Sequence, residues 1–305
     1  MSNTDLKYPN VFVLGVPRAG TTSIHYALSS RGDMSVSSTK EPGYLHYCNG
    51  AIKSFNGPDD NIATIRKVQD YADYVSLFDW QSKFVVDVTP SYFSDREALC
   101  NIAEKCQSPK VIVILRDPVD RAFSHYSKFK SLGRETLPFL DALTKGSERV
   151  SAGWNYNWDY VQQSSYSSNL LFCRDKFGAD NVHVVFYSDI VSDSAGELLS
   201  MLKFLGADTG DVHELDKTNL SGVYKSGFYK ACFDFIDTYK YRVRKILPTT
   251  VLNRILPFFH KFKSNVTVKN ESLSDADRKA AIAFFEEDIA NLEKLVGRDL
   301  NAWKS

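Results

Sequence analysis

Apolar residues gather in four short runs that are spread along this chain. Each run is dominated by Val, Ile, Leu and Phe, and together they occupy residues 11–14, 84–88, 111–115 and 182–187. Continuous apolar runs of this length are typical of buried parallel strands. Between them, apolar residues recur at helical spacing in the segments 21–31, 95–106, 118–129, 166–177 and 194–205. Strands that alternate with helices predict an α/β fold, with a central parallel sheet flanked by helices on both faces.

The pattern is less regular in three other regions. Residues 48–80 and 131–160 mix polar and aromatic residues with turn-forming ones, so we expect loops and short helices in the first and irregular structure in the second. Near the C-terminus, Ser274 and Asp277 have the spacing of a capping box. The apolar residues that follow them predict one helix that continues to Leu295.

Composition and charge narrow the class of protein. A hydrophobic content of 43% and a charged content of 24% are ordinary for a soluble globular chain, and no repeat or linker divides residues 1–305, so we expect a single domain. The formal net charge is zero, which gives no general attraction to nucleic acid. The five cysteines form no C-x-x-C pair, and the N-terminus has neither a basic nor a long apolar stretch. These features predict a cytoplasmic protein with reduced thiols.

A glycine-rich loop follows the first strand. Gly15 and Gly20 have the spacing of the G-x-x-x-x-G-K-[ST] loop that binds nucleotide phosphates, and Thr22 occupies its hydroxyl position. A strand, such a loop and then a helix direct backbone N–H groups and the helix dipole at an anion. However, Thr21 replaces the lysine with which kinases and ATPases neutralise the β- and γ-phosphates, and the loop carries a cation at Arg18 instead. The loop therefore favours a phosphate-containing ligand other than ATP.

Two motifs resemble those of a known family. The sequence PRAGTTS at 17–23 is similar to the 5′-phosphosulfate loop of sulfotransferases that use 3′-phosphoadenosine 5′-phosphosulfate (PAPS), and VIVILRDPVDRAFSHYSKFK at 111–130 is similar to the strand and helix that hold its 3′-phosphate. The resemblance implies the P-loop-like sulfotransferase fold, PAPS as donor, 3′-phosphoadenosine 5′-phosphate (PAP) as product, and no metal. It assigns the two phosphate groups to Arg18, Ala19, Gly20, Thr21, Thr22, Ser23, Arg116 and Ser124.

The same resemblance indicates residues for catalysis. Lys40-Glu41-Pro42 is similar to a segment of heparan sulfate-type sulfotransferases in which the glutamate faces the acceptor hydroxyl, so Glu41 is the candidate base and Arg18 stabilises the leaving phosphate. A second segment, DVTPSYF at 87–93, is also similar to that group. Asp87 stands where the family has an acidic residue, although valine follows it where the family usually has lysine. His46 is a reserve candidate, because the small-molecule branch of the family uses a histidine base. A looser match at 221–227 implies nucleotide contacts by Tyr224 and Lys225.

These residues predict transfer of a sulfonate group to a hydroxyl or amine, with a glycan or glycolipid as the expected acceptor. The aromatic stretch 154–160 would suit a sugar face or a lipid. Residues 238–270 contain eight Lys or Arg and no Asp or Glu, which indicates a solvated basic face or a contact with a membrane surface, the nucleotide or an anionic glycan. Two alternatives stay open, namely a nucleotide kinase or other NTPase, and a non-catalytic module that binds a nucleotide or glycan.

Overall fold

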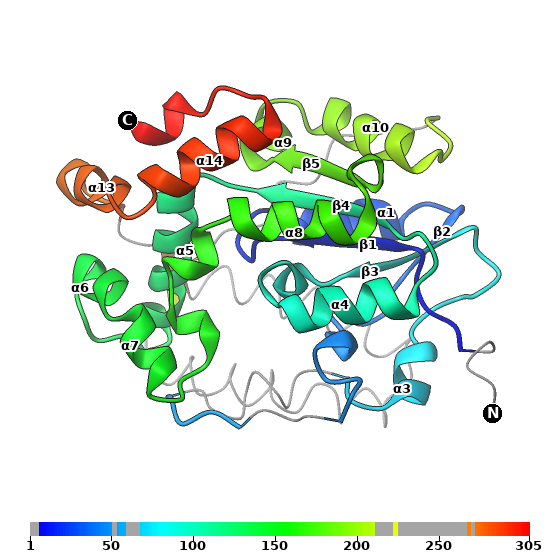
Figure 1. The fold of residues 1–305 in the computed structure, drawn as a ribbon, viewed down its shortest axis with the longest axis horizontal. Coiled ribbons are helices and arrows are strands. Elements are labelled where there is room, and N and C mark those ends of the chain that lie inside the picture. Colours follow the sequence, from blue (N-terminus) through cyan, green and yellow to red (C-terminus); the bar gives the residue numbers. More distant parts are fainter. Residues whose placement is uncertain (1–5, 51–53, 59–67, 211–221, 225–266, 270–271) are drawn as a thin grey trace.

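The computed structural model describes residues 6–50, 54–58, 68–210, 222–224, 267–269 and 272–305. Its centre is a five-stranded parallel sheet with the strand order β2-β3-β1-β4-β5 (Figure 1). The strands of this sheet are β1 (Val11–Gly15), β2 (Met34–Val36), β3 (Phe84–Val88), β4 (Lys110–Leu115) and β5 (Val182–Phe186). A separate antiparallel pair consists of β6 (Gly222–Tyr224) and β7 (Thr267–Lys269).

The central strands are buried on both faces, which explains their unbroken apolar sequences. Every residue of β1 and β3 is buried, as is every residue of β4 after Lys110. The register aligns Val11 of β1 with Val86 of β3 and with Lys110 of β4. Because all five strands are parallel, the segments that follow them emerge at one edge of the sheet, where α/β proteins bind their ligands.

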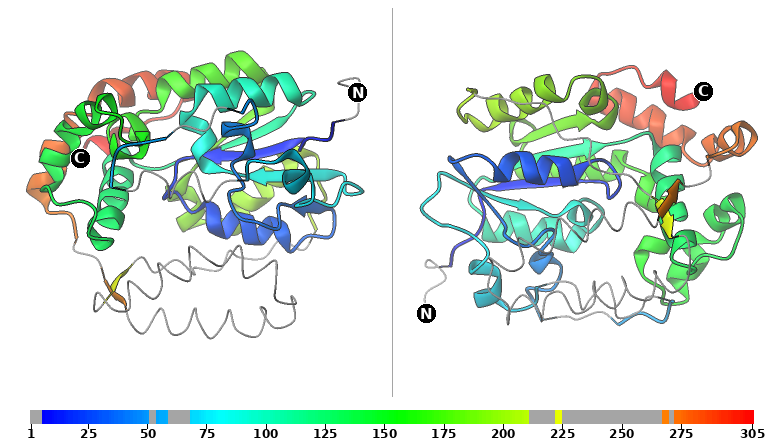
Figure 2. Two further views of the ribbon diagram at one scale, coloured as in Figure 1. Left: turned by 90° about the horizontal axis from the view of Figure 1, so that it is seen from below. Right: turned by 180° about the vertical axis from the view of Figure 1, so that it is seen from behind.

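Helices cover both faces of the sheet. Figures 1 and 2 show α4 and α8 on one face and α1 on the other, which confirms the predicted α/β architecture. The α-helices are α1 (Thr21–Ser29), α3 (Tyr71–Val75), α4 (Arg96–Lys105), α5 (Pro118–Ser131), α6 (Phe139–Thr144), α7 (Gly146–Ser151), α8 (Ser167–Phe177), α9 (Tyr187–Ser192), α10 (Ser194–Leu205), α13 (Asp275–Ile282) and α14 (Glu286–Val296). The 3₁₀ turns are η1 (Tyr44–His46), η2 (Pro90–Ser94), η3 (Tyr156–Trp158), η4 (Gln162–Ser164), η5 (Ala179–Asn181) and η6 (Asn301–Lys304).

The structure differs from the sequence-based expectation in three places. The prediction of a single C-terminal helix was wrong. Ser274 does cap a helix, and its hydroxyl accepts from the Asp277 N–H. The helix is interrupted between α13 and α14, where Phe285 leaves the helical conformation with φ −123°. The segment 131–160 contains α6, α7 and η3, and the edge strand β2 was not expected. The basic stretch 238–270 lies outside the described residues apart from 267–269.

No helix among the described residues combines the length and the apolar character needed to cross a membrane.

Candidate active site

The loop between β1 and α1 forms a cradle for an anion. Gly20 is the N-cap of α1 with φ 79°, and as a glycine it has no side chain with which to cap the first turn of the helix. A Cβ atom on Gly20 would lie 2.9 Å from Cε2 of Tyr187, so both the backbone conformation and the close ring require glycine. Arg18 also has a positive φ, of 81°, which is uncommon for a residue with a side chain. The loop therefore holds a strained conformation that directs N–H groups outward at the helix start.

The second motif lies against this loop. The guanidinium of Arg116, after β4, donates from Nη1 to the carbonyl oxygen of Arg18 at 2.8 Å. Arg18 in turn donates from Nε to the hydroxyl oxygen of Ser124 on α5 at 3.0 Å. The Cζ atom of Arg116 also lies 5.0 Å from the centre of the Tyr187 ring. The structure thus brings together the two segments, about 100 residues apart, that the sequence assigned to the phosphate groups of one ligand.

The electrostatics of this cluster suit an anionic ligand. Burial, followed by the nearby positive charge of Arg116, lowers the pKa of Arg18, although a guanidinium stays charged at neutral pH. Within the described residues, Nε of Arg116 is buried and has no hydrogen-bond partner. A buried donor of this kind is costly unless a ligand accepts from it. The residues present therefore fit a nucleotide with separate 5′- and 3′-phosphate groups.

The candidate base Glu41 is tethered to the phosphate loop. Its neighbour Lys40 donates from Nζ to the hydroxyl oxygen of Thr22 in the first turn of α1. The same Nζ lies 3.3 Å from Oε1 of Glu41, and the two side chains are 37% and 39% exposed. Glu41 has φ 54°, so it shares with Arg18 a left-handed backbone conformation. A carboxylate beside the loop, partly open to solvent, is placed to take a proton from an incoming acceptor.

Asp87 occupies a different environment. Its side chain is fully buried and accepts hydrogen bonds from Thr89 at 2.6 Å, from Tyr74 at 2.8 Å and from Tyr92 at 3.3 Å. A carboxylate enclosed in this way has no face to offer an acceptor molecule. The geometry therefore indicates that Asp87 fixes the segment after β3, and it gives no support to the predicted catalytic role.

His46, the reserve base, is held at both ring nitrogens. Nδ1 lies 2.6 Å from Oδ2 of Asp95, and Nε2 lies 2.8 Å from Oγ of Ser91. The residue is 3% exposed. Since a carboxylate only accepts hydrogen bonds, the proton between His46 and Asp95 lies on Nδ1. His46 thus contributes more to the order of these loops than to proton transfer.

The comparisons with known proteins agree with this geometry. The profile of the sulfotransferase family matches residues 9–211, which include the phosphate loop, Glu41, Arg116 and Ser124. The chain belongs to the sulfotransferase family. Among the described residues of this sulfotransferase-family chain, no group of His, Cys, Asp or Glu side chains is arranged to hold a metal ion.

Individual relatives match to different extents. Mouse heparan sulfate glucosamine 3-O-sulfotransferase 3A1 is 35% identical over 127 residues, which are 41% of this chain and 32% of that protein. The chain thus spans about a third of the length of the curated relatives that it matches first. Mouse heparan sulfate glucosamine 3-O-sulfotransferase 5 is 22% identical over 260 residues, 83% of this chain and 70% of that protein. The crystal structure of a sulfotransferase from Alicyclobacillus acidocaldarius has the same fold, with a TM-score of 0.73, 24% identity, and coverage of 98% of this chain and 100% of that chain.

Sequence reasoning did not single out Arg121, which lies beneath the phosphate loop. It is fully buried and donates to the carbonyl oxygen of Pro17 at 3.3 Å, to Oγ of Ser164 at 3.2 Å and to Nδ1 of His125 at 2.7 Å. Burial is the main cause that lowers its pKa to about 10. A signal was present, because Arg121 precedes Ser124 by three residues, the spacing that places two side chains on one helix face.

The late nucleotide contacts stay predictions. Tyr224 is the last residue of β6, which pairs with β7, whereas Lys225 lies outside the described residues.

Proposed function

We propose that this protein is a PAPS-dependent sulfotransferase that moves a sulfonate group to a hydroxyl or amine acceptor. One observation carries the proposal: Arg116 and Ser124 of the second motif each form a hydrogen bond with Arg18 of the phosphate loop. A single ligand with phosphate groups at two positions fits both segments at once, and membership of the sulfotransferase family selects PAPS among such ligands.

The chain's own residues account for the demands of the reaction. PAPS supplies the sulfonate: the acceptor oxygen or nitrogen forms a bond to sulfur, the bond from sulfur to the phosphate oxygen breaks, and PAP leaves. Glu41 takes the proton of the acceptor. Arg18 and the N–H groups at the start of α1 stabilise the negative charge that develops on the leaving phosphate. Arg116 and Ser124 hold the 3′-phosphate by charge-assisted and hydroxyl hydrogen bonds.

The acceptor in this proposal is a glycan or glycolipid. The matched relatives support a carbohydrate, since they are heparan sulfate glucosamine 3-O-sulfotransferases. Contact of residues 238–270 with a membrane surface or an anionic glycan, and a cytoplasmic location, also belong to the proposal, and they rest on sequence alone.

Calorimetry with PAP, ADP and Mg²⁺-ATP tests the donor site. We expect PAP to bind more tightly than either of the others, and Arg116→Ala to remove most of that preference, because it deletes the charged partner of the 3′-phosphate. Ser124→Ala should weaken PAP binding by about fivefold, the effect of one hydrogen bond. Ser131→Ala is the matched control, because this exposed serine lies at the end of the same helix. Preference for Mg²⁺-ATP would contradict the proposal and favour a kinase or NTPase.

Glu41→Gln separates chemistry from binding. Glutamine keeps the size of the side chain but cannot accept the proton, so transfer from PAPS should fall by about 100-fold or more while PAP affinity stays within a factor of two. The rate is followed with ³⁵S-labelled PAPS and a mixture of glycan acceptors. Unchanged transfer by Glu41→Gln would remove this residue from the role of base without affecting the donor assignment.

A further inference from the structure

Lys40 connects the phosphate loop to the candidate base. Its ammonium donates to the hydroxyl oxygen of Thr22, in the first turn of α1, and lies 3.3 Å from Oε1 of Glu41. In an extended chain, neighbouring side chains point to opposite sides. The left-handed conformation of Glu41, with φ 54°, turns the chain, and the charged ends of the two neighbours meet. One ammonium thus contacts both the segment proposed to hold the leaving phosphate and the residue proposed to take the acceptor's proton.

The stability of the fold does not account for this arrangement. The side chains of Lys40 and Glu41 are 37% and 39% exposed, and ion pairs with this exposure contribute little to the free energy of folding. A positive φ at a residue with a side chain is unfavourable, and such conformations cluster at functional sites. The position of Lys40 is therefore better explained by a ligand than by folding.

The ammonium of Lys40 keeps a hydrogen-bond donor for a ligand. An ammonium carries three N–H groups, and Thr22 and Glu41 engage at most two of them. Among the described residues, Lys40 has no other polar partner. Because the Thr22 oxygen accepts from Lys40, the proton of that hydroxyl is also available to an anion. Lys40 and Thr22 thus present two donors beside each other at the start of α1.

The neighbours of Lys40 on the loop and on α1 carry no charge. Thr21 stands at the loop position where kinases and ATPases have lysine. His25 lies on the same helix face as Thr22, three residues further on, and is 7% exposed. Burial, followed by the positive charge of Lys40, lowers the pKa of His25 to about 4, so its ring is neutral at physiological pH. The ammonium charge of Lys40 is therefore not duplicated by Thr21 or His25.

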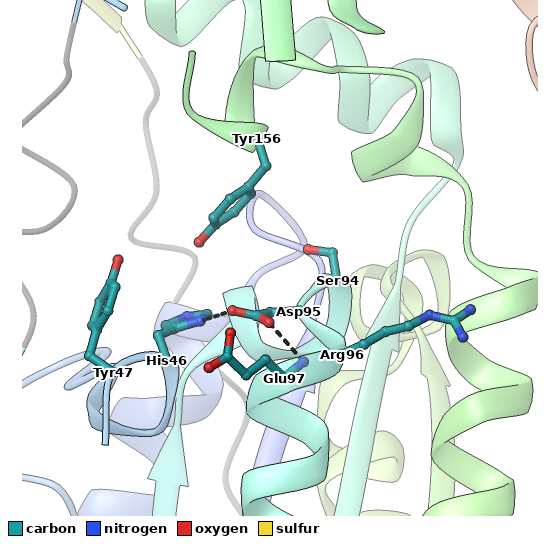
Figure 3. A pocket seen from close by; sticks show the side chains of 7 residues that line it. All are labelled: His46, Tyr47, Ser94, Asp95, Arg96, Glu97 and Tyr156. Atoms are coloured by element: carbon teal, nitrogen blue, oxygen red, sulfur yellow. Dashed lines mark hydrogen bonds and ion pairs between the residues drawn. The ribbon is translucent and has the colours of Figure 1, made fainter. Parts of the chain in front are cut away.

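His46, which follows Glu41 by five residues, does not offer a further donor. Its two ring nitrogens lie 2.6 Å from Asp95 and 2.8 Å from Ser91. Figure 3 shows the ring directed at Asp95, on the wall of a cavity of about 300 Å³. Both nitrogens are thus engaged within the protein.

We propose that Lys40 is a further catalytic residue that binds the sulfonate group of PAPS, an assignment that rests on the sulfotransferase function proposed above. In an in-line displacement, the group in transit lies between the leaving and the attacking atoms. Thr22 belongs to the side of the leaving phosphate and Glu41 to the side of the acceptor, and Lys40 contacts both. The acceptor forms its bond to sulfur and gives its proton to Glu41, while the bond from sulfur to the phosphate oxygen breaks. Lys40 keeps its protons throughout and stabilises charge on the sulfonate oxygens by donating to one of them.

Affinities for PAPS and PAP, measured by calorimetry without acceptor, separate a contact with the sulfonate from a role through the base. The two ligands differ by the sulfonate group, and Glu41→Gln is the background because it removes the carboxylate that Lys40 contacts. In this background we expect Lys40→Met to weaken PAPS binding by about tenfold, the effect of one charge-assisted hydrogen bond, and to change PAP affinity by no more than about twofold. Lys40→Arg should retain most of the PAPS affinity, because it keeps the positive charge. Lys203→Met, at an exposed position of α10, is the matched control and should change neither affinity.

The rate of transfer gives a second readout. In the otherwise unchanged chain, Lys40→Met should lower the rate of sulfonate transfer by about 100-fold, as expected for the loss of one donor to a developing charge. An unchanged rate, an equal loss of PAPS and PAP affinity, or no loss of either would each overturn the role of Lys40. The sulfotransferase proposal would still stand in those cases if the wild type transferred sulfonate from PAPS. If the wild type bound neither PAPS nor PAP, the proposed function itself would be wrong, and the role of Lys40 would fall with it.

Discussion

Backbone strain is concentrated at the residues with proposed chemical roles. Among the described residues, the non-glycine residues with positive φ are Arg18, Glu41 and Ser108, and the first two belong to the phosphate loop and the candidate base. Each such conformation costs on the order of 1–3 kcal/mol, and it persists where neighbouring contacts over-determine it. Here the contacts are the bond from Arg116 to the carbonyl of Arg18 and the position of Lys40 between Thr22 and Glu41.

Arg121 is fully buried and Arg149 is partly buried, and the two arginines differ in how their charge is compensated. Arg149 pairs with Glu135, with N–O distances of 2.6 and 2.9 Å, whereas no described carboxylate pairs with Arg121. An isolated buried charge is unfavourable, so Arg121 is retained at a cost to stability that a bound dianion offsets. We infer that Arg121 acts on the ligand through the phosphate loop as a positioning residue.

Substitution by methionine distinguishes the two arginines. Arg121→Met should weaken PAP binding by about tenfold or more while lowering the thermal midpoint of the free protein only slightly, because the lost hydrogen bonds and the lost charge burial offset each other. Arg149→Met should lower the unfolding free energy by about 3–5 kcal/mol, because it leaves the buried carboxylate of Glu135 without its charged partner. It should leave the PAP affinity of the folded protein unchanged. Calorimetry and thermal unfolding of both variants check this. If Arg121 had only a structural role, Arg121→Met would lower the unfolding free energy and leave PAP affinity unchanged, as expected for Arg149→Met.

At the scale of elements, the turn into α1 requires a residue without a Cβ atom at position 20. Gly20 has φ 79° and lies against the Tyr187 ring. Gly50 has φ 81°, and no atom of the described residues lies within 4 Å of the point where its Cβ would be. Gly20→Ala and Gly50→Ala therefore carry similar backbone strain, of about 1 kcal/mol. Only Gly20→Ala adds a clash in the phosphate loop. We expect it to weaken PAP binding strongly, and Gly50→Ala to change stability alone; equal PAP affinities in the two variants would contradict this.

The segment from α6 to η3 is organised by one buried carboxylate. Burial by itself would raise the pKa of Glu135, but the hydrogen bonds from Arg149, from the Leu137 N–H and from Tyr160 outweigh it and lower that pKa below its ordinary value of 4.5. The Cζ atom of Arg149 also lies 5.1 Å from the ring centre of Trp158, in the η3 turn. The ion pair thus joins the loop before α6 to α7, and the contact with Trp158 extends this link to η3.

A pH dependence follows from the lowered pKa of Glu135. The stabilisation is fully present above pH 4.5 and is lost as the pH falls through the lower pKa of the folded state. The midpoint of urea unfolding, followed by tryptophan fluorescence between pH 3 and pH 7, should therefore drop at the acid end in the wild type and vary less in Glu135→Gln. Glu148→Gln, at an exposed position of α7, should retain the wild-type profile. A Glu135→Gln profile parallel to that of the wild type would contradict this account.

At the scale of the whole molecule, the sequence predicted what depends on local pattern. The strands β1, β3 and β4 were predicted because burial on both faces leaves continuous apolar runs. The edge strand β5 is only partly buried, but four of its five residues are still apolar. The phosphate loop was predicted because its residues are contiguous. The edge strand β2 has three residues, too few for a pattern. The break before α14 and the helices of 131–160 depend on contacts between distant segments, such as Glu135 with Arg149. The spacing of Arg121 and Ser124 on one helix was visible in the sequence, but the burial of Arg121 against Pro17 and Ser164 was not.

The C-terminal helix α14 is connected to the donor site through the start of α8. Asp288 of α14 accepts from the N–H of Tyr166 at 2.6 Å, from the N–H of Ser167 at 3.0 Å and from the Ser167 hydroxyl at 2.6 Å, so it caps α8 from another part of the chain. The hydroxyl of Tyr166 then donates to the carbonyl oxygen of Arg116 at 2.9 Å. A carboxylate near the end of the sequence is thus two contacts away from the arginine assigned to the 3′-phosphate.

Asp288→Ala should therefore affect both stability and the ligand. Loss of the cap should lower the unfolding free energy by about 1–2 kcal/mol. Without Asp288, Tyr166 should move and its hydroxyl should no longer hold the carbonyl of Arg116. PAP affinity should therefore fall by about threefold to tenfold, whereas ADP affinity, which does not involve the 3′-phosphate, should change little. Glu287→Ala, an exposed neighbour on α14, is the matched control. If stability fell without any change in the ratio of PAP to ADP affinity, the C-terminal helices would support the fold alone, and the coupling from Asp288 to Arg116 would be absent.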